Sequence, residues 1–230
     1  MNVEVPAAVE RLLTADVAEE IAATFGDQTV YPQRVVVDSP AAPSLELPHS
    51  ARRFPGWPGP VLVLSDENQG VCSWGVSLGV DSGKVLVGGD LLDAGEGEAG
   101  QATVPYAASI EDFIAARRWD HLCLSAPLGL QAQASELDEA SLAYLQVRLP
   151  PAVETAGWPG TRQYRFEGRG LRVMLWSYPG QCDWWISASS EQSLKVFVAG
   201  LLDLSDLRSS LWSNEETGAR LLDDLRRRAP

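Results

Sequence analysis

The residues best suited to binding chemistry are a carboxylate followed by two amides, at Glu67, Asn68 and Gln69. A carboxylate beside two amides can clamp a ligand or a basic side chain through charge-assisted hydrogen bonds. Polar side chains of this kind also satisfy backbone groups within turns, and they then serve the fold alone. The sequence leaves both roles open for Glu67 and favours the turn-forming role for Asn68.

A glycine-rich stretch over residues 88–100 carries a second group of acidic side chains, at Asp90, Asp93, Glu96 and Glu98. No Lys or Arg occurs between Lys84 and Arg117, so we expect a negative local potential there. These carboxylates either steer and pair with basic side chains of a partner or remain solvated in a loop. Their spacing does not match an EF-hand, and no calcium site is expected.

Groups suited to catalysis are few. The two histidines are His49 and His121, and no G-x-S-x-G elbow accompanies them. On a strand, His121 and Cys123 would share a face and form a Cys–His pair. A structural histidine beside a core cysteine is the favoured interpretation. Nucleotide-binding glycine loops are also missing, so we expect no enzyme activity, no cofactor and no metal.

Tryptophan offers a different kind of binding residue. Trp184 and Trp185 are adjacent, so on a strand they point to opposite faces of a sheet. One is expected in the core. The other is exposed, covered by a helix or used at an interface, where tryptophan is enriched. We take Trp184, and Trp74 of the first half, as candidate binding residues.

The composition is that of a soluble, acidic protein. Of 230 residues, 45% are hydrophobic, and the net charge of -13 corresponds to a pI of about 4.5. This charge argues against general nucleic-acid binding and suits a basic partner, or it serves solubility alone. Three widely spaced cysteines indicate reduced core thiols. With acidic residues near the start and no run long enough to span a membrane, we expect a cytoplasmic protein.

The apolar pattern predicts the elements that position these residues. In the first half we expect two helices over residues 5–25, a short strand over 34–37 and a helical turn over 47–54. An antiparallel meander should follow, over residues 61–64, 71–78 and 84–87, because turns this short do not allow parallel crossovers. Ser109 is a credible cap for a helix reaching about residue 119.

The second half predicts a linker over residues 125–133 and a helix over 135–147. Strands follow at 164–166, 171–178 and 183–188, then a helix capped by Ser189 or Ser190 and a charged helical tail over 215–228. The tetrapeptide G-W-P-G occurs at 56–59 and at 157–160, which indicates either a duplicated unit or chance. One continuous sheet and two coupled units are both open.

Three stretches of the first half resemble the SUKH superfamily, which spans bacterial toxin-immunity proteins and fungal cell-wall-assembly regulators. They are Leu47-Pro48 leading to Arg53-Phe54, the E-N-Q-G turn closing on Trp74, and the helix start at residues 109–114. The resemblance covers residues 1–124. It implies an α+β domain with helices on one face of a mainly antiparallel sheet, no cofactor, and function through protein binding.

The expectation from the sequence is an α+β domain over residues 1–124, extended by a C-terminal α/β unit over 125–230. Its expected function is that of a non-catalytic, immunity-type module that occludes a basic toxin domain, without contacts to nucleic acid or membrane. A regulatory or scaffold module, and a small-molecule binder with a pocket between the halves, are the alternatives. The oligomeric state is open.

Overall fold

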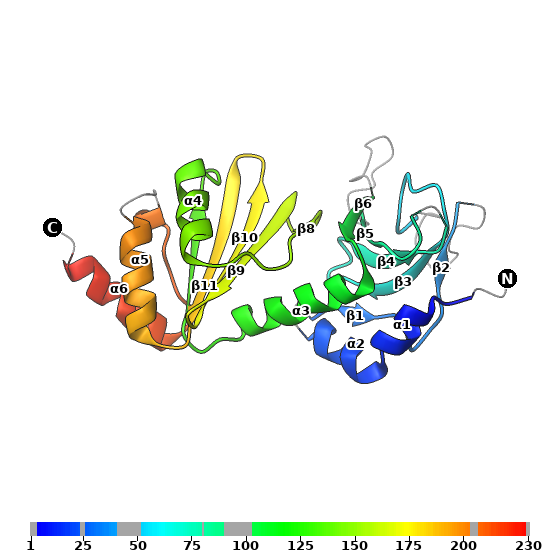
Figure 1. Ribbon diagram of the computed structural model, residues 1–230, viewed down its shortest axis with the longest axis horizontal. Coiled ribbons are helices and arrows are strands. Elements are labelled where there is room, and N and C mark those ends of the chain that lie inside the picture. Colours follow the sequence, from blue (N-terminus) through cyan, green and yellow to red (C-terminus); the bar gives the residue numbers. More distant parts are fainter. Residues whose placement is uncertain are drawn as a thin grey trace. The chain divides into compact units, whose positions relative to one another are not determined.

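The apolar run at residues 61–64 forms the first strand of an antiparallel meander, as predicted. Its strands are β3 (Val61–Asp66), β4 (Ser73–Ser77) and β5 (Val85–Gly88). Figure 1 shows the computed structural model, which describes residues 4–23, 26–40, 52–79, 81–89, 103–202 and 207–228. Within these residues the α+β class is confirmed, because the long strands of both sheets pair antiparallel.

The chain divides into two units, each with its own sheet. Unit 1 comprises residues 1–118 with 156–158, and unit 2 comprises residues 119–155 with 159–230. The domain boundary expected after Leu124 coincides with the end of helix α3 (Ile110–Leu124), whereas the division between the units falls inside this helix, after Arg118.

In unit 1, short strands extend the meander on both sides. Strands β1 (Gln28–Thr29) and β2 (Val37–Asp38) both pair with β3, and β6 (Val104–Ala107) pairs with β5. The first five residues of β3 are buried, as expected for a strand covered on both faces.

The helices of unit 1 pack on one face of its sheet. Helices α1 (Ala7–Leu12), α2 (Ala15–Ala22) and the first turns of α3 share a core with alternate residues of the strands. The predicted cap of α3 is confirmed, because the Asp112 N–H donates to Ser109 Oγ at 3.1 Å. Of the helical turn expected over 47–54, residues 47–51 lie outside the described residues and 52–54 are not helical.

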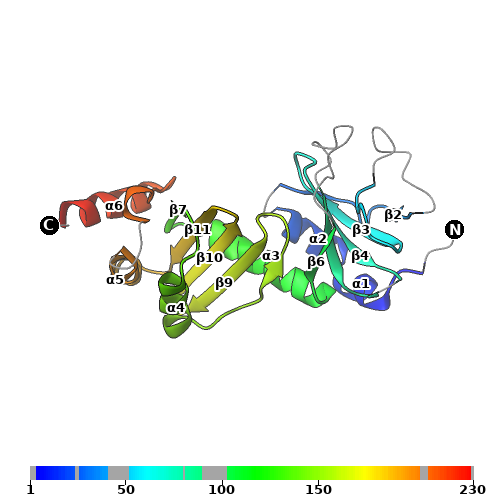
Figure 2. The ribbon, with the colours of Figure 1, turned by 90° about the horizontal axis from the view of Figure 1, so that it is seen from above.

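In unit 2, the strand order is β7-β11-β10-β9-β8, as Figure 2 shows for the long strands. These strands are β7 (Gly129–Ala134), β8 (Thr155–Ala156), β9 (Arg162–Gly168), β10 (Leu171–Tyr178) and β11 (Gln181–Ala188). The predicted linker over 125–133 is wrong, because β7 occupies its second half. The strand G-L-Q-A-Q-A alternates small apolar and polar residues, which gives only a weak hydrophobic signal.

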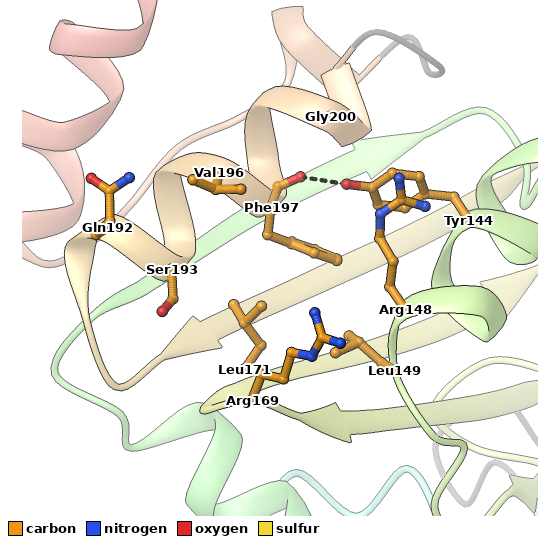
Figure 3. A pocket seen from close by; sticks show the side chains of 10 residues that line it. All are labelled: Tyr144, Arg148, Leu149, Arg169, Leu171, Gln192, Ser193, Val196, Phe197 and Gly200. Carbon is orange, nitrogen blue, oxygen red and sulfur yellow. Dashed lines mark hydrogen bonds between the residues drawn. The ribbon is translucent and has the colours of Figure 1, made fainter.

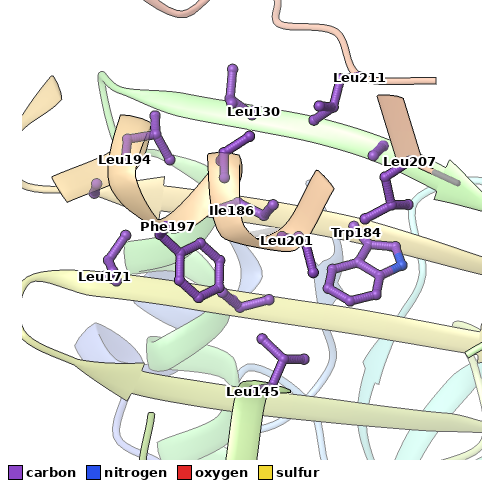
Figure 4. Packing of buried hydrophobic residues seen from close by; sticks show 14 of the residues in the cluster. Leu130, Leu145, Leu171, Trp184, Ile186, Leu194, Phe197, Leu201, Leu207 and Leu211 are labelled. Atoms are coloured by element: carbon purple, nitrogen blue, oxygen red, sulfur yellow. The ribbon is translucent and has the colours of Figure 1, made fainter. Parts of the chain in front are cut away.

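Both faces of the unit 2 sheet are covered. Helices α4 (Glu139–Arg148), α5 (Glu191–Leu202) and α6 (Glu216–Arg228), with the short η2 (Leu207–Ser209), enclose the main core on one face. Figure 4 shows part of this core, where side chains of α5 pack over those of the strands. On the other face, Trp119 and Cys123 of α3 cluster with Met174. The side chains of β10 and β11 therefore alternate between two apolar environments.

Candidate functional site

The E-N-Q-G turn uses the Glu67 carboxylate to hold its own backbone. Glu67 Oε2 accepts the N–H of Gln69 at 2.7 Å and the N–H of Val71 at 3.4 Å. The Glu67 N–H donates to the carbonyl of Cys72, and only 7% of the residue is exposed. This carboxylate stabilises the turn, while Asn68 and Gln69 are exposed at its tip.

An ion pair at the base of the turn fixes its position on the sheet. Arg53 donates from Nε and Nη2 to the two oxygens of Asp66, at 3.0 and 3.1 Å. Ser73 Oγ donates to the same carboxylate at 2.6 Å. The two exposed amides therefore stand on a rigid hairpin, because paired geometry of this kind restricts both side chains.

Both tryptophans selected from the sequence are core residues, which corrects their assignment to a binding surface. Trp74 is fully buried, with its ring against Trp158 at 5.7 Å between centroids and the Arg117 guanidinium 4.7 Å from its centroid. Trp184 is 1% exposed and lies within the main core of unit 2. The sequence showed that Trp184 and Trp185 face opposite ways, but the position of the helices decides which of them is inside.

Trp185 lies on the other face of the sheet, half-buried against Trp176 with ring centroids 3.9 Å apart. This face also receives the end of α3. The second tryptophan of the pair is thus covered in part by a helix, which is one of the environments expected from the sequence.

The acidic candidates Asp90, Asp93, Glu96 and Glu98 lie outside the described residues. The described part of unit 1 carries another acidic group on neighbouring helices, here named the acidic helical surface. Its members are all exposed and are Glu10, Asp16, Glu19, Glu20 and Glu111.

Two arginines lie at the acidic helical surface, and each already forms an ion pair with one of its carboxylates. Arg118 donates to the Glu20 carboxylate at 2.8–3.0 Å, and Arg11 lies 3.9 Å from Glu111. The ion pairs formed by the described residues include none with Glu10, Asp16 or Glu19. These three carboxylates remain open to an external cation. Burial, together with the nearby charge of Glu10, also raises the pKa of Tyr31.

Unit 2 contains a pocket of about 450 Å³ between the end of α4, helix α5 and the β9–β10 turn (Figure 3). Its volume lies within the range of small-molecule sites. The residues that line it are Tyr144, Arg148, Leu149, Arg169, Leu171, Gln192, Ser193, Val196, Phe197 and Gly200. This set joins apolar and aromatic side chains to two arginines and holds no carboxylate.

Close packing shapes one wall of the pocket. Tyr144 Oη donates to the carbonyl of Phe197 at 3.0 Å, which ties α4 to α5. A Cβ at Gly200 would stand 2.5 Å from that hydroxyl, so only glycine allows this approach. The guanidinium of Arg148 stacks 3.7 Å from the centroid of the Tyr144 ring, a favourable cation–π geometry.

The two arginines of this pocket are not predicted from the sequence. The helix predicted over 135–147 stops one residue before Arg148, and the E-G-R-G stretch predicts only a turn between two strands. A usable signal was present, because a two-residue hairpin turn normally takes Asn or Gly where this chain has Arg169.

The geometry of His121 and Cys123 does not form a Cys–His pair. Both residues lie on helix α3 rather than on a strand, and side chains two positions apart on a helix do not face each other. Burial raises the pKa of the Cys123 thiol to about 12, although Ser187 Oγ donates to its sulfur at 3.7 Å. Over the described ranges, no group of three or more His, Cys, Asp or Glu side chains is arranged to hold a metal ion.

Comparisons of the chain with protein-family models, curated proteins and solved structures found no match. Assignment to the SUKH superfamily therefore remains a proposal. In the described part of the chain, no helix has the length and apolar character needed to cross a membrane.

Proposed function

We propose that this chain is a protein-binding module for a basic partner, and that it acts as an immunity-type protein that occludes a toxin domain without turnover. The observation that carries the proposal is the set of exposed carboxylates at Glu10, Asp16 and Glu19, which no described cation neutralises. Complementary charge of this kind steers association and disfavours acidic partners.

The distribution of charge supports unit 1 as the contact region. Residues 1–118 contain 17 acidic and 7 basic residues, which leaves a net charge of -10, whereas residues 119–230 contain 14 and 11, which leaves -3. Three of the seven cations are used inside the fold, where Arg52, Arg53 and Arg117 pair with Asp38, Asp66 and Asp27. Few cations are left to balance the surface carboxylates.

The E-N-Q-G turn supports the finer assignment. It lies in unit 1, and its Asn68 and Gln69 are exposed at the tip of a hairpin held by Arg53 and Asp66. Amides on a rigid turn add directional hydrogen bonds to the longer-range attraction of the carboxylates. The resemblance of this turn to the SUKH pattern is the reason for proposing a toxin domain as the partner.

The proposal is tested by measuring binding to the basic protein encoded beside this gene. The triple variant Glu10→Lys, Asp16→Lys, Glu19→Lys should weaken binding by at least about tenfold, since interfacial charge pairs typically couple by more than 1 kcal/mol. The control Glu136→Lys, Glu215→Lys, Asp223→Lys changes the net charge equally within unit 2 and should bind normally. Equal losses in both variants would contradict a contact at the acidic helical surface.

A second experiment tests the immunity-type role itself. Co-expression with the neighbouring basic protein should rescue growth if that protein is toxic, and the triple variant of unit 1 should rescue poorly. If the captured partner has no toxicity, the chain is better described as a regulatory or scaffold module. Absence of any protein partner would contradict both roles.

A further inference from the structure

We propose that the pocket of unit 2 binds a small organic anion, with one carboxylate or phosphate group on an apolar body. The inference concerns α4, α5 and the β9–β10 turn, and it is independent of the partner proposed for unit 1. Two features of the pocket point to this ligand class, namely an apolar wall and a pair of arginines that form no ion pair with the carboxylates that the structure describes.

The apolar wall suits a hydrocarbon chain or ring. Leu149, Leu171 and Phe197 are buried and close one side of the cavity. Val196 also lines the cavity and is 64% exposed, so its apolar side chain is accessible to a ligand. A ligand body resting on Val196 and Phe197 would remove this apolar surface from water.

The two arginines differ from the other cations of unit 2. Among unit 2 cations whose side chains the structure describes, Arg148 and Arg169 form no ion pair. The other six each have a carboxylate within 4 Å, and they are Arg162, Arg165, Arg172, Lys195, Arg220 and Arg227. In a chain with a net charge of -13, two guanidinium groups beside a cavity whose lining holds no carboxylate indicate an external anion.

The backbone holds Arg169 at the pocket despite a conformation that disfavours arginine. Arg169 has φ +53° and Gly170 has φ +72°, so both residues of the turn occupy the left-handed region. The Gly170 carbonyl accepts the N–H of Ser189 at 2.8 Å, and a Cβ on Gly170 would collide with Ser189 Oγ. These contacts hold the turn against the start of α5. Arg169, the residue in the strained conformation, is the one that carries the charge.

The geometry suggests how the anion is held. Arg148 is preorganised by its stacking on Tyr144, and the turn fixes the backbone position from which Arg169 reaches the pocket. Planar guanidinium groups bind carboxylate and phosphate oxygens through paired hydrogen bonds. Ser193 adds a polar group at the first turn of α5. The anionic head is thus placed at the arginines, with the apolar body along α5.

The test uses the full chain and a matched set of probes with one hydrocarbon tail. Octanoate and octyl phosphate should bind at a single site by calorimetry, and octanol should bind at least about tenfold more weakly, because it lacks the charge-assisted hydrogen bonds. Octyltrimethylammonium should not bind. Acetate and inorganic phosphate test the head groups without the tail. The octyl anion that binds with the higher affinity identifies the preferred head group.

Two variants separate ligand binding from folding. Arg169→Asn places a residue that tolerates positive φ in the turn, so the thermal midpoint should hold or rise while octanoate affinity falls at least about tenfold. Arg148→Met keeps an apolar stem over Tyr144 and should weaken binding similarly. Arg162→Met removes a cation at the end of β9 opposite the pocket turn and should change nothing. The proposal would be overturned if octanol and octanoate bound with equal affinity, or if neither pocket variant changed the affinity for octanoate. It would also be overturned if no octyl anion bound at about 1 mM.

Discussion

The cysteine side chains show how burial lowers the reactivity of a thiol. All three thiols are free and buried. Burial, reinforced by the nearby charge of Asp183, raises the pKa of Cys182 to about 12, the same value reached at Cys123. Because the thiolate is the reactive form, these side chains are chemically silent in the folded protein.

We therefore expect no reaction of the native chain with a thiol-specific disulfide reagent at about pH 8, a value at which an exposed cysteine reacts readily. In denaturant, all three thiols should react at once. The absorbance of the released aromatic thiolate gives the stoichiometry. Rapid modification of one thiol in the native chain would contradict the buried positions of Cys72, Cys123 and Cys182.

The Asp138 carboxylate caps helix α4, and its contribution to stability should depend on pH. Its burial would raise its pKa, but hydrogen bonds from the Ser141 hydroxyl and N–H hold the pKa below the ordinary value of 3.8. Because the folded pKa is lower than the unfolded one, the stabilisation is complete above pH 3.8 and is lost as the pH falls through the folded pKa.

Asp138→Ala removes the N-cap of α4 and should lower the free energy of unfolding by about 1 kcal/mol near neutral pH. In urea titrations, the difference from wild type should shrink well below pH 3.8. Glu136→Ala, an exposed position nearby, serves as the control and should have little effect. A difference independent of pH would show that the carboxylate charge does not contribute.

Among the elements, α3 is joined to the sheet of unit 2 by a buried ion pair. Arg165 of β9 donates from Nε and Nη2 to Asp120 at 2.6 and 2.8 Å, and both side chains are almost fully buried. Nη1 of Arg165 donates to the carbonyl of Val153 and to Thr155 Oγ1. The last turns of α3 are therefore fixed to β9 by polar contacts as well as by Trp119.

Asp120→Ala should lower the free energy of unfolding by about 3–5 kcal/mol, because Arg165 would be left as an uncompensated buried charge. The double variant Asp120→Leu, Arg165→Met removes both charges and should lose less. Together with the single variants Asp120→Leu and Arg165→Met, it completes a double-mutant cycle whose urea titrations provide the coupling energy. If the double variant were less stable than Asp120→Ala, the charge itself would not be the cause.

Strand β4 contains a glycine that the packing of unit 1 requires. A Cβ on Gly75 would stand 2.6 Å from Val61 Cγ1 and 2.7 Å from the Leu62 carbonyl oxygen. Gly75→Ala should therefore destabilise the chain by about 3 kcal/mol through overpacking. Gly129→Ala, where the nearest atoms are 3.8 Å away, is the matched control and should be tolerated in thermal melts. Comparable losses at both sites would contradict this explanation.

For the whole molecule, the uneven distribution of charge has consequences for association. The excess of acidic residues lies in residues 1–118, while the two unpaired arginines described above lie in unit 2. A basic protein and a small organic anion would accordingly be attracted to different parts of the chain. The two proposed functions can therefore be removed by separate substitutions.

Raising the ionic strength from about 0.1 M to about 0.5 M should slow association with the basic partner by at least about tenfold, because exposed charges are screened beyond the Debye length. Dissociation should change less, since short-range contacts determine it. Surface plasmon resonance measures both rates. An association rate that does not depend on salt would exclude the acidic helical surface as the steering element.

The sequence by itself determined the local elements and much of their order. The apolar runs predicted the meander of β3, β4 and β5, and the shortness of its turns required it to be antiparallel. Helical spacing gave α1 and α2, and the caps at Ser109 and Ser190 are present as expected. These features depend on neighbours in the chain, so they can be inferred without knowing the tertiary packing.

Only the tertiary structure decided which side chains face solvent and which meet. Trp184 rather than Trp185 enters the main core because α4, α5 and α6 cover that face, and β7 is recruited because β11 provides its hydrogen-bonding partner. Arg148 and Arg169, 21 positions apart in the chain, line one pocket because α4 ends beside the β9–β10 turn. Contacts between residues distant in sequence depend on packing, which local residue patterns do not encode.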